Sequence, residues 1–113
     1  MLNSVNQTST FRNWLAGLTD EKAKGAIAAR IVRIQSGLMG DFKAFGKVIE
    51  FRVDVSKGYR FYATKRGKTV ILLLNGGHKK GQQADIAAAK AMIAALGKAD
   101  EEAAGKAEGR TKK

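Results

Sequence analysis

Residues 49–85, IEFRVDVSKGYRFYATKRGKTVILLLNGGHKKGQQAD, decide the fold of this chain, because strand-like runs and tight turns follow one another there. From Ile49 to Val55 apolar residues alternate with polar ones, which predicts a half-buried strand. Ser56-Lys57-Gly58 then predicts a turn into a second alternating strand over residues 59–64. Three consecutive strands with short connections are expected to pair as neighbours in one sheet.

The third strand is expected over residues 69–75, after a turn at Arg66-Gly67. Its core, Val70–Leu74, has no polar break, so we expect this strand to be central and covered on both faces. Gly76-Gly77 is expected to end it. A helix from about Gln82 to Leu96 should follow.

Two helices are expected before this block, because apolar residues recur there at helical spacing. The first is capped by Ser9 or Thr10 and carries Phe11, Trp14, Leu15 and Leu18. The second starts at Thr19 or Asp20, ends at Ser36-Gly37 and carries the stripe Ala23, Ile27, Ile31 and Ile34. The 113 residues fit one small domain over residues 1–96, and residues 97–113, rich in Gly, Ala, Lys and Glu, are expected to be disordered.

The charge of the chain is concentrated in one segment. Residues 42–82 hold ten Lys or Arg against Glu50 and Asp54, which is +8 of a formal net charge of +11. Such focusing favours a polyanionic partner such as nucleic acid. An anionic membrane is the weaker alternative, because no basic helix presents a bulky apolar face.

Several classes of protein are excluded by composition. The chain has no cysteine and one histidine, so disulfides, thiolate chemistry and a structural zinc site are not expected. The N-terminus lacks the pattern of a signal peptide, and the longest apolar run is too short to span a membrane. The cytoplasm is the expected location.

Arg52 and Arg60 are the first candidates for a functional site. They lie on neighbouring predicted strands, at positions that alternate with the apolar ones, so both should project from the same non-core face. Guanidinium groups there can hold phosphate oxygens bidentately. In the alternative interpretation, Arg60 forms an ordinary surface ion pair with Glu50.

Other side chains can contribute to such a face, and each has an ordinary structural alternative. Tyr62 should share the face of Arg60 and can stack on a base or pack across strands, whereas Tyr59 should lie in the core. His78 is the side chain that titrates near neutral pH, which suits a general acid or base, although an exposed loop histidine is the simpler reading. Gln82 or Gln83 lies where a helix begins, and the backbone amides at that end can help to bind phosphate.

Six motifs in register carry a resemblance to a known family. They are Phe11-x-x-Trp14-Leu15-x-x-Leu18, Arg30-Ile31-x-Arg33-Ile34, Gly37-x-x-Gly40-Asp41-x-Lys43, Glu50-x-Arg52, Gly58-Tyr59-Arg60-x-Tyr62 and Leu72-Leu73-x-x-Gly76-Gly77-x-Lys79. Together they resemble the RelE/ParE toxin superfamily, in its HigB-like, phage-associated "addiction module killer" branch. The resemblance covers roughly residues 11–96, and its strength lies in the order of the motifs, since each alone is weak.

The resemblance implies an α+β fold with two N-terminal helices packed on a twisted, mainly antiparallel sheet, and a C-terminal helix. It implies a toxin that cleaves mRNA on the ribosome by attack of the 2′-hydroxyl on the adjacent phosphate, without a metal or cofactor. It also implies an antitoxin partner, a helix-turn-helix protein encoded by the adjacent gene.

The family's residues map onto this chain with two departures. Arg60 matches the arginine implicated in phosphate stabilisation, Arg52 matches a basic residue of the preceding strand, and Lys79 matches the family lysine. Glu50 stands where the classical nucleases have a second basic residue, and no tyrosine follows Tyr62 to match their C-terminal catalytic tyrosine. The expected catalytic residues are Arg60, Arg52, Lys79 and His78, and the expected RNA contacts are Lys43, Lys57, Tyr62, Lys80 and Gln82.

Two other functions share parts of this pattern. A ParE-like toxin of the same fold would inhibit DNA gyrase by binding, without hydrolysis, and fold alone does not separate it from a nuclease. A simple RNA-binding protein has less support, because the chain lacks a helix-turn-helix signature and the aromatic pair of RNA-recognition modules.

Overall fold

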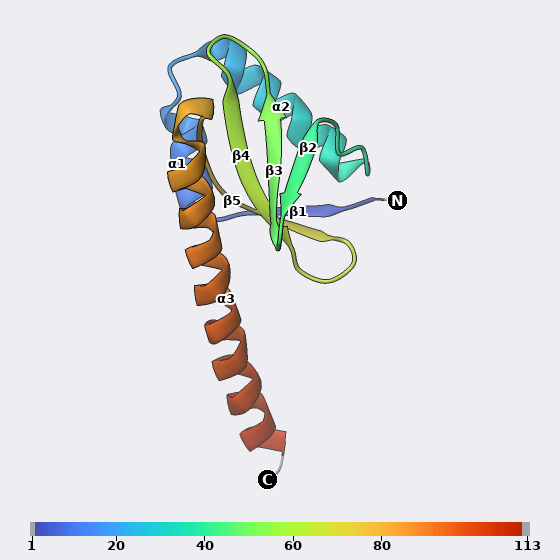
Figure 1. Ribbon diagram of the computed structural model, residues 1–113. Coiled ribbons are helices and arrows are strands. Elements are labelled where there is room, and N and C mark those ends of the chain that lie inside the picture. The colour runs from blue at the N-terminus through green and yellow to red at the C-terminus, as the bar shows by residue number, and fades with distance from the viewer. Residues whose placement is uncertain (1, 112–113) are drawn as a thin grey trace.

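A computed structural model describes residues 2–111 of the protein, with side chains described up to Gly97. It confirms the α+β class, with two N-terminal helices, a five-stranded sheet and a C-terminal helix (Figure 1). The elements are β1 (Ser4–Gln7), α1 (Ser9–Gly17), α2 (Glu21–Gln35), β2 (Phe42–Phe45), β3 (Val48–Val53), β4 (Tyr59–Lys65), β5 (Val70–His78), the 3₁₀ turn η1 (Lys79–Gly81) and α3 (Gln82–Thr111).

The strands lie in the order β1-β5-β4-β3-β2, and all neighbours except β1 and β5 are antiparallel. The sequence did not predict β1 or β2. Ser4–Gln7 has one apolar residue, and it forms a strand because it pairs in parallel with the edge of β5, from Ser4 opposite Val70 to Gln7 opposite Leu73. Strands defined by a distant partner leave little trace in local periodicity.

One face of the sheet carries the main hydrophobic core beneath α1 and α2. This core includes the predicted stripe of α2 together with Phe11, Phe51, Phe61, Ile71 and Leu73. Phe11 and Phe51 are fully buried, and the partly buried Trp14 packs against the same core and contacts the Phe11 ring, which agrees with the apolar patterns that the sequence showed at these positions. Asp20 begins α2 as its N-cap, because its carboxylate accepts a hydrogen bond from the Ala23 amide at 3.0 Å.

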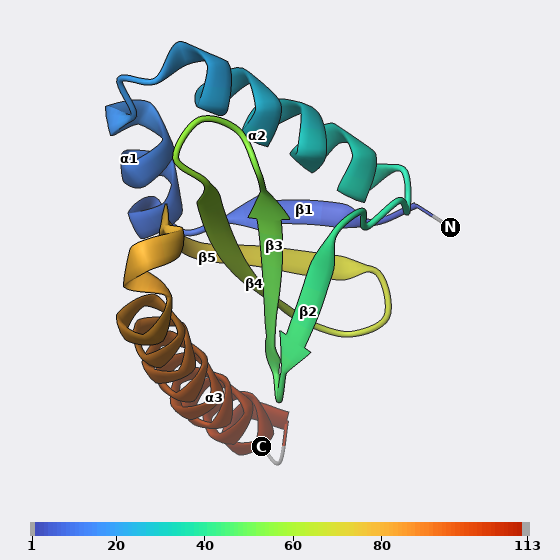
Figure 2. The same ribbon diagram turned by 45° about the horizontal axis from the view of Figure 1, so that its top comes forward.

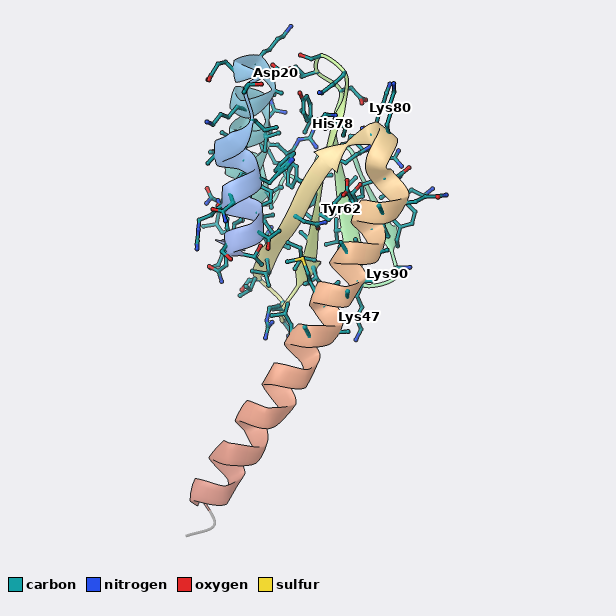
Figure 3. All side chains as sticks on the ribbon, turned by 90° about the vertical axis from the view of Figure 1, so that its left-hand side faces the viewer. Asp20, Lys47, Tyr62, His78, Lys80 and Lys90 are labelled. Atoms are coloured by element: carbon teal, nitrogen blue, oxygen red, sulfur yellow. The ribbon has the colours of Figure 1, made fainter. Side chains whose placement is uncertain are left out.

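The opposite face is covered in part by α3, as the edge-on view of the sheet in Figure 3 shows. Val48, Tyr62, Leu74 and Ala89 form a second buried cluster there, and Ile86 and Ile93 pack against it. For the two strands that carry Arg52 and Arg60 the sequence predicted a non-core face here, which is wrong for the part beneath α3, where Val48 and Tyr62 are buried. As expected, β5 is an interior strand with apolar contacts on both faces.

The glycine pair does not end β5, which continues to His78. A side chain at Gly76 would collide with the Trp14 ring, and one at Gly77 would collide with the Asp85 carboxylate. The glycines therefore let α1 and α3 approach the two faces of the strand closely.

The C-terminal helix is longer than expected. The sequence placed its end near Leu96 and disorder over residues 97–113, of which 112 and 113 lie outside the described residues, whereas the helical backbone continues to Thr111 and extends beyond the sheet (Figure 1). Ala, Lys and Glu, which dominate this segment, have high helix propensity even without a periodic apolar face. No helix within the described residues is long and apolar enough to cross a membrane.

Candidate nucleic-acid interface

Arg52 and Arg60 lie directly opposite each other on β3 and β4. On its other side, Arg60 is paired with Gly77 of β5, where no side chain separates the strand from α3. The expectation that both arginines project from one face is confirmed, because residues in register on neighbouring strands share a face. The pair lies beside the N-terminal end of α3, at the margin of the area that this helix covers.

The buried side chain of Glu50 connects the strands of the two arginines to the start of α3. It is fully buried and accepts hydrogen bonds from Arg52 Nε at 2.9 Å, Gln82 Nε2 at 2.7 Å and the Tyr62 hydroxyl at 3.3 Å. A buried carboxylate needs such partners, because its desolvation is otherwise very costly. Glu50 therefore anchors three elements, β3, β4 and α3, and its lone pairs are engaged with donors instead of facing a substrate.

Arg60 is held much more loosely than Arg52. Its Nη1 lies 3.4 Å from the Asp54 carboxylate, which is 74% exposed, and 3.2 Å from the Tyr59 carbonyl oxygen. Its Nε is buried without a hydrogen-bond partner among the described residues. An ion pair with so exposed a partner contributes little, so an anion can replace Asp54 at small cost. The sequence alternative, a pair between Arg60 and Glu50, is not what forms, since Glu50 pairs with Arg52.

The two tyrosines of β4 are both buried, at 2% exposure for Tyr59 and 0% for Tyr62. This confirms the core position of Tyr59. Tyr62 lies in the second cluster beneath α3, so its ring is not open to a nucleotide base, and of its two expected roles the packing role is the one observed. Burial, and then the nearby Glu50 carboxylate, raise the pKa of the Tyr62 hydroxyl, which makes it a poor source of a catalytic proton.

His78 lies away from the arginine pair. It is opposite Tyr59 in the β4–β5 register, and the two rings are 5.4 Å apart, on the face that carries the main core. Arg60 and Gly77, the next pair along the strands, face the other side. The expected general acid or base is therefore exposed on the opposite face of the sheet from the arginines.

The expected lysines lie at three places in the fold. Lys43 lies opposite Glu50 on the edge strand β2, on the arginine face, and its Nζ is 5.1 Å from the Phe45 ring centroid. Lys57 and Lys79 flank the β3–β4 turn, where Lys57 Nζ is 5.9 Å from the Tyr59 ring and the Lys79 side chain packs near Gly58. Lys80 is exposed in η1 beside the start of α3 (Figure 3).

Asn75 and Asp85 are polar residues of this region that the sequence did not identify. Asn75 is 6% exposed and donates from Nδ2 to the Asp85 carbonyl oxygen at 3.0 Å, which ties β5 to the first turn of α3. Burial raises the pKa of the Asp85 carboxyl group, which lies against Gly77. The signal in the sequence that could have identified this position is the polar residue Asn75 directly after an apolar run.

The arrangement suits phosphate binding more than metal binding. Among the described residues, no group of three or more His, Asp or Glu side chains is placed to hold a metal ion. Lys43, Arg52 and Arg60 instead place positive charge on one face, with the amide of Gln82 and the start of α3 beside them. Arg52 compensates the charge of the single buried acid between them, Glu50, so Lys43 and Arg60 carry the remaining positive charge, with the exposed Asp54 beside Arg60.

Comparison with known proteins finds one informative relative. No protein-family model matches the chain. An uncharacterized protein of Haemophilus influenzae is 39% identical over 98 residues, which cover 86% of this chain and 99% of that protein. Identity at this level over nearly the whole of both chains indicates a shared ancestor and a shared fold.

Proposed function

We infer that this chain belongs to one family with the uncharacterized Haemophilus influenzae protein. We propose that it is the toxin of a toxin–antitoxin module, an endonuclease that cleaves mRNA on the ribosome. The order of elements is consistent with the RelE/ParE-like fold that the sequence motifs imply. The proposed place of action is the cytoplasm, where mRNA is translated.

One observation carries the proposal: Arg60 offers a guanidinium group that is preorganised but weakly engaged. Arg52 lies directly opposite, and buried Glu50 fixes its position. The partner of Arg60, Asp54, is exposed and distant at 3.4 Å, and the Arg60 Nε has no hydrogen-bond partner among the described residues. Donors held ready for charge that develops in a transition state are the largest single source of catalysis in many enzymes.

The proposed reaction needs little beyond positioning and charge stabilisation. The 2′-hydroxyl oxygen attacks the adjacent phosphorus, the bond to the 5′-oxygen breaks, and a 2′,3′-cyclic phosphate and a 5′-hydroxyl remain. Arg60 would bind the non-bridging oxygens as negative charge increases on them, and Arg52 and Lys43 would hold the neighbouring phosphates. Glu50 is buried and accepts three hydrogen bonds, and His78 lies on the opposite face, so we assign the proton transfers to neither.

The decisive test is cleavage of mRNA in a reconstituted translation reaction, with the 5′ ends mapped by primer extension. We expect new ends within ribosome-bound codons, and a loss of about 10²–10³-fold in cleavage rate for Arg60→Ala, as for other charge-stabilising donors. Arg33→Ala, which removes an exposed arginine of α2, is the matched control and should cleave normally. A reaction without ribosomes should leave the mRNA intact.

Intact mRNA and normal protein synthesis with the unaltered chain would contradict the proposal. Loss of gyrase supercoiling in the same preparation would then favour the ParE-like alternative, in which Arg60→Ala should be nearly silent. The proposed antitoxin is tested separately, by asking whether the protein encoded by the adjacent gene co-purifies with the chain and restores translation.

A further inference from the structure

A second surface lies on the other face of the sheet from the arginines and has a different character. It is an open groove of about 490 Å³ between the segment that follows α2, the edge strand β2 and the β4–β5 turn. Figure 2 shows these three segments gathered at the β2 edge of the sheet. We refer to it as the β2 groove, and Met39, Phe42, Ala44 and Ile49 form its apolar lining while Lys65 and Lys68 form its basic rim.

Two large apolar side chains at or beside the β2 groove are exposed to water. Phe42 is 47% exposed, and Leu38, adjacent to the lining residue Met39, is 63% exposed. Contiguous apolar patches with a polar rim mark interaction sites. The groove also borders an unpaired strand edge, because β2 is the last strand of the sheet and hydrogen-bonds to β3 alone within the described sheet.

The charge of the rim selects the chemistry of the occupant. Lys65 and Lys68 are exposed and form no ion pair, because the ion pairs among the described residues are Arg52–Glu50 and Arg60–Asp54, on the other face. A second copy of this chain, with its own formal charge of +11, would be repelled. The groove therefore suits an acidic partner.

The apolar lining distinguishes a protein partner from RNA. Proteins hold single-stranded RNA by stacking bases on exposed aromatic faces, and usually on more than one. Here the single aromatic lining residue is Phe42, which already packs against Phe51 at a centroid distance of 6.3 Å. The other apolar lining residues are aliphatic, which suits aliphatic side chains of a polypeptide.

We propose that the β2 groove and the adjoining edge of β2 bind an extended acidic segment of a partner protein, which adds a strand to the sheet. Exposed sheet edges commonly recruit such segments, with backbone hydrogen bonds supplying affinity and alternate side chains supplying specificity. Residues of the added strand that face Phe42 and Ala44 would enter the groove, and those that face Lys43 would lie on the arginine face. The segment should thus alternate aliphatic and acidic residues, with further acidic residues near Lys65 and Lys68.

The test uses the full chain and a blocked synthetic peptide of about ten residues that alternates valine and glutamate. Amide chemical shifts in a ¹⁵N NMR titration should change most over residues 42–45 and 65–68, with slower hydrogen exchange along β2. A peptide that alternates serine and glutamate keeps the charge without the aliphatic side chains, and should bind at least about tenfold more weakly.

Two sets of variants separate the apolar and the electrostatic contributions. Phe42→Ala and the double variant Lys65→Glu/Lys68→Glu should each weaken binding of the valine–glutamate peptide by about tenfold or more. All three residues are substantially exposed, so the fold should survive, which circular dichroism will check. Lys22→Glu, an exposed charge reversal in the first turn of α2, is the matched control and should change affinity by less than about twofold.

The proposal would be overturned if the peptide left the amide chemical shifts of residues 42–45 unchanged. It would also be overturned if an RNA of about ten uridines, or a higher protein concentration without peptide, changed those chemical shifts in the same way. The experiment requires no translation, so it is independent of the proposed nuclease activity. Peptide binding without mRNA cleavage would leave this inference standing and contradict the proposed function, and cleavage without peptide binding would do the reverse.

Discussion

Glu50 sets the geometry of the basic centre at the scale of single residues. Replacing it with alanine would leave Arg52, Gln82 and Tyr62 without their shared acceptor, and all three are buried or partly buried. We expect Glu50→Ala to lower the free energy of unfolding by about 2–4 kcal/mol, measured by urea denaturation. Asp54→Ala removes an exposed carboxylate from the other ion pair and should cost less than about 1 kcal/mol. Equal losses for the two variants would contradict the anchoring role of Glu50.

Gly76 is a second residue whose role comes from its surroundings. A Cβ at this position would lie inside the contact distance of the Trp14 ring, so Gly76→Ala should force the ring to move and cost about 1–3 kcal/mol of stability. Gly25, in an exposed turn of α2, has no atom within 4 Å of such a Cβ, and Gly25→Ala should instead stabilise the chain by up to about 1 kcal/mol. Thermal unfolding of the two variants should therefore shift in opposite directions, and a shift in the same direction would refute this reading.

The start of α2 links one element to another and makes stability depend on pH. The Asp20 carboxylate accepts hydrogen bonds from the Ala23 amide and from the Tyr59 hydroxyl on β4, at 3.0 and 3.2 Å. The hydrogen bond from the Ala23 amide is the main cause that lowers the pKa of Asp20 below its ordinary value of 3.8. Because the folded pKa is the lower one, this stabilisation is present above pH 3.8 and is lost as the pH falls through the folded pKa.

Asp20→Asn tests this linkage, since asparagine still caps a helix but does not titrate. The unaltered chain should be the more stable of the two near neutral pH, and urea midpoints of the two should converge as the pH falls below 3.8. A difference that stays constant over that range would show that the charge of Asp20 is not responsible.

The whole molecule presents a strongly positive surface, with a formal charge of +11. Binding to single-stranded RNA should therefore weaken steeply with salt, because cationic side chains release counterions from the phosphates. If Lys43 contacts one phosphate on the arginine face, Lys43→Ala should reduce the slope of log K against log salt by about 0.7, measured by fluorescence anisotropy. Lys22→Ala, at the start of α2, should leave the slope unchanged, and equal effects of both variants would indicate a diffuse attraction instead of a site.

Local periodicity determined much of this protein. The alternation over residues 49–64 predicted β3 and β4 and the common face of Arg52 and Arg60, because the direction of a side chain in a strand follows from its position alone. The apolar stripes predicted α1, α2 and the first part of α3 for the same kind of reason. These properties depend on residues close together in the chain.

Only the tertiary structure decided what lies over and beside those elements. It placed α3 on the arginine face, which buried Tyr62 and Glu50, and it put His78 on the opposite face. It also recruited β1 and β2 as the edges of the sheet and so created the β2 groove. The physical reason is that burial, strand partners and the matching of donors to acceptors depend on residues far apart in the sequence, such as Glu50 and Gln82, which meet only when the chain has folded.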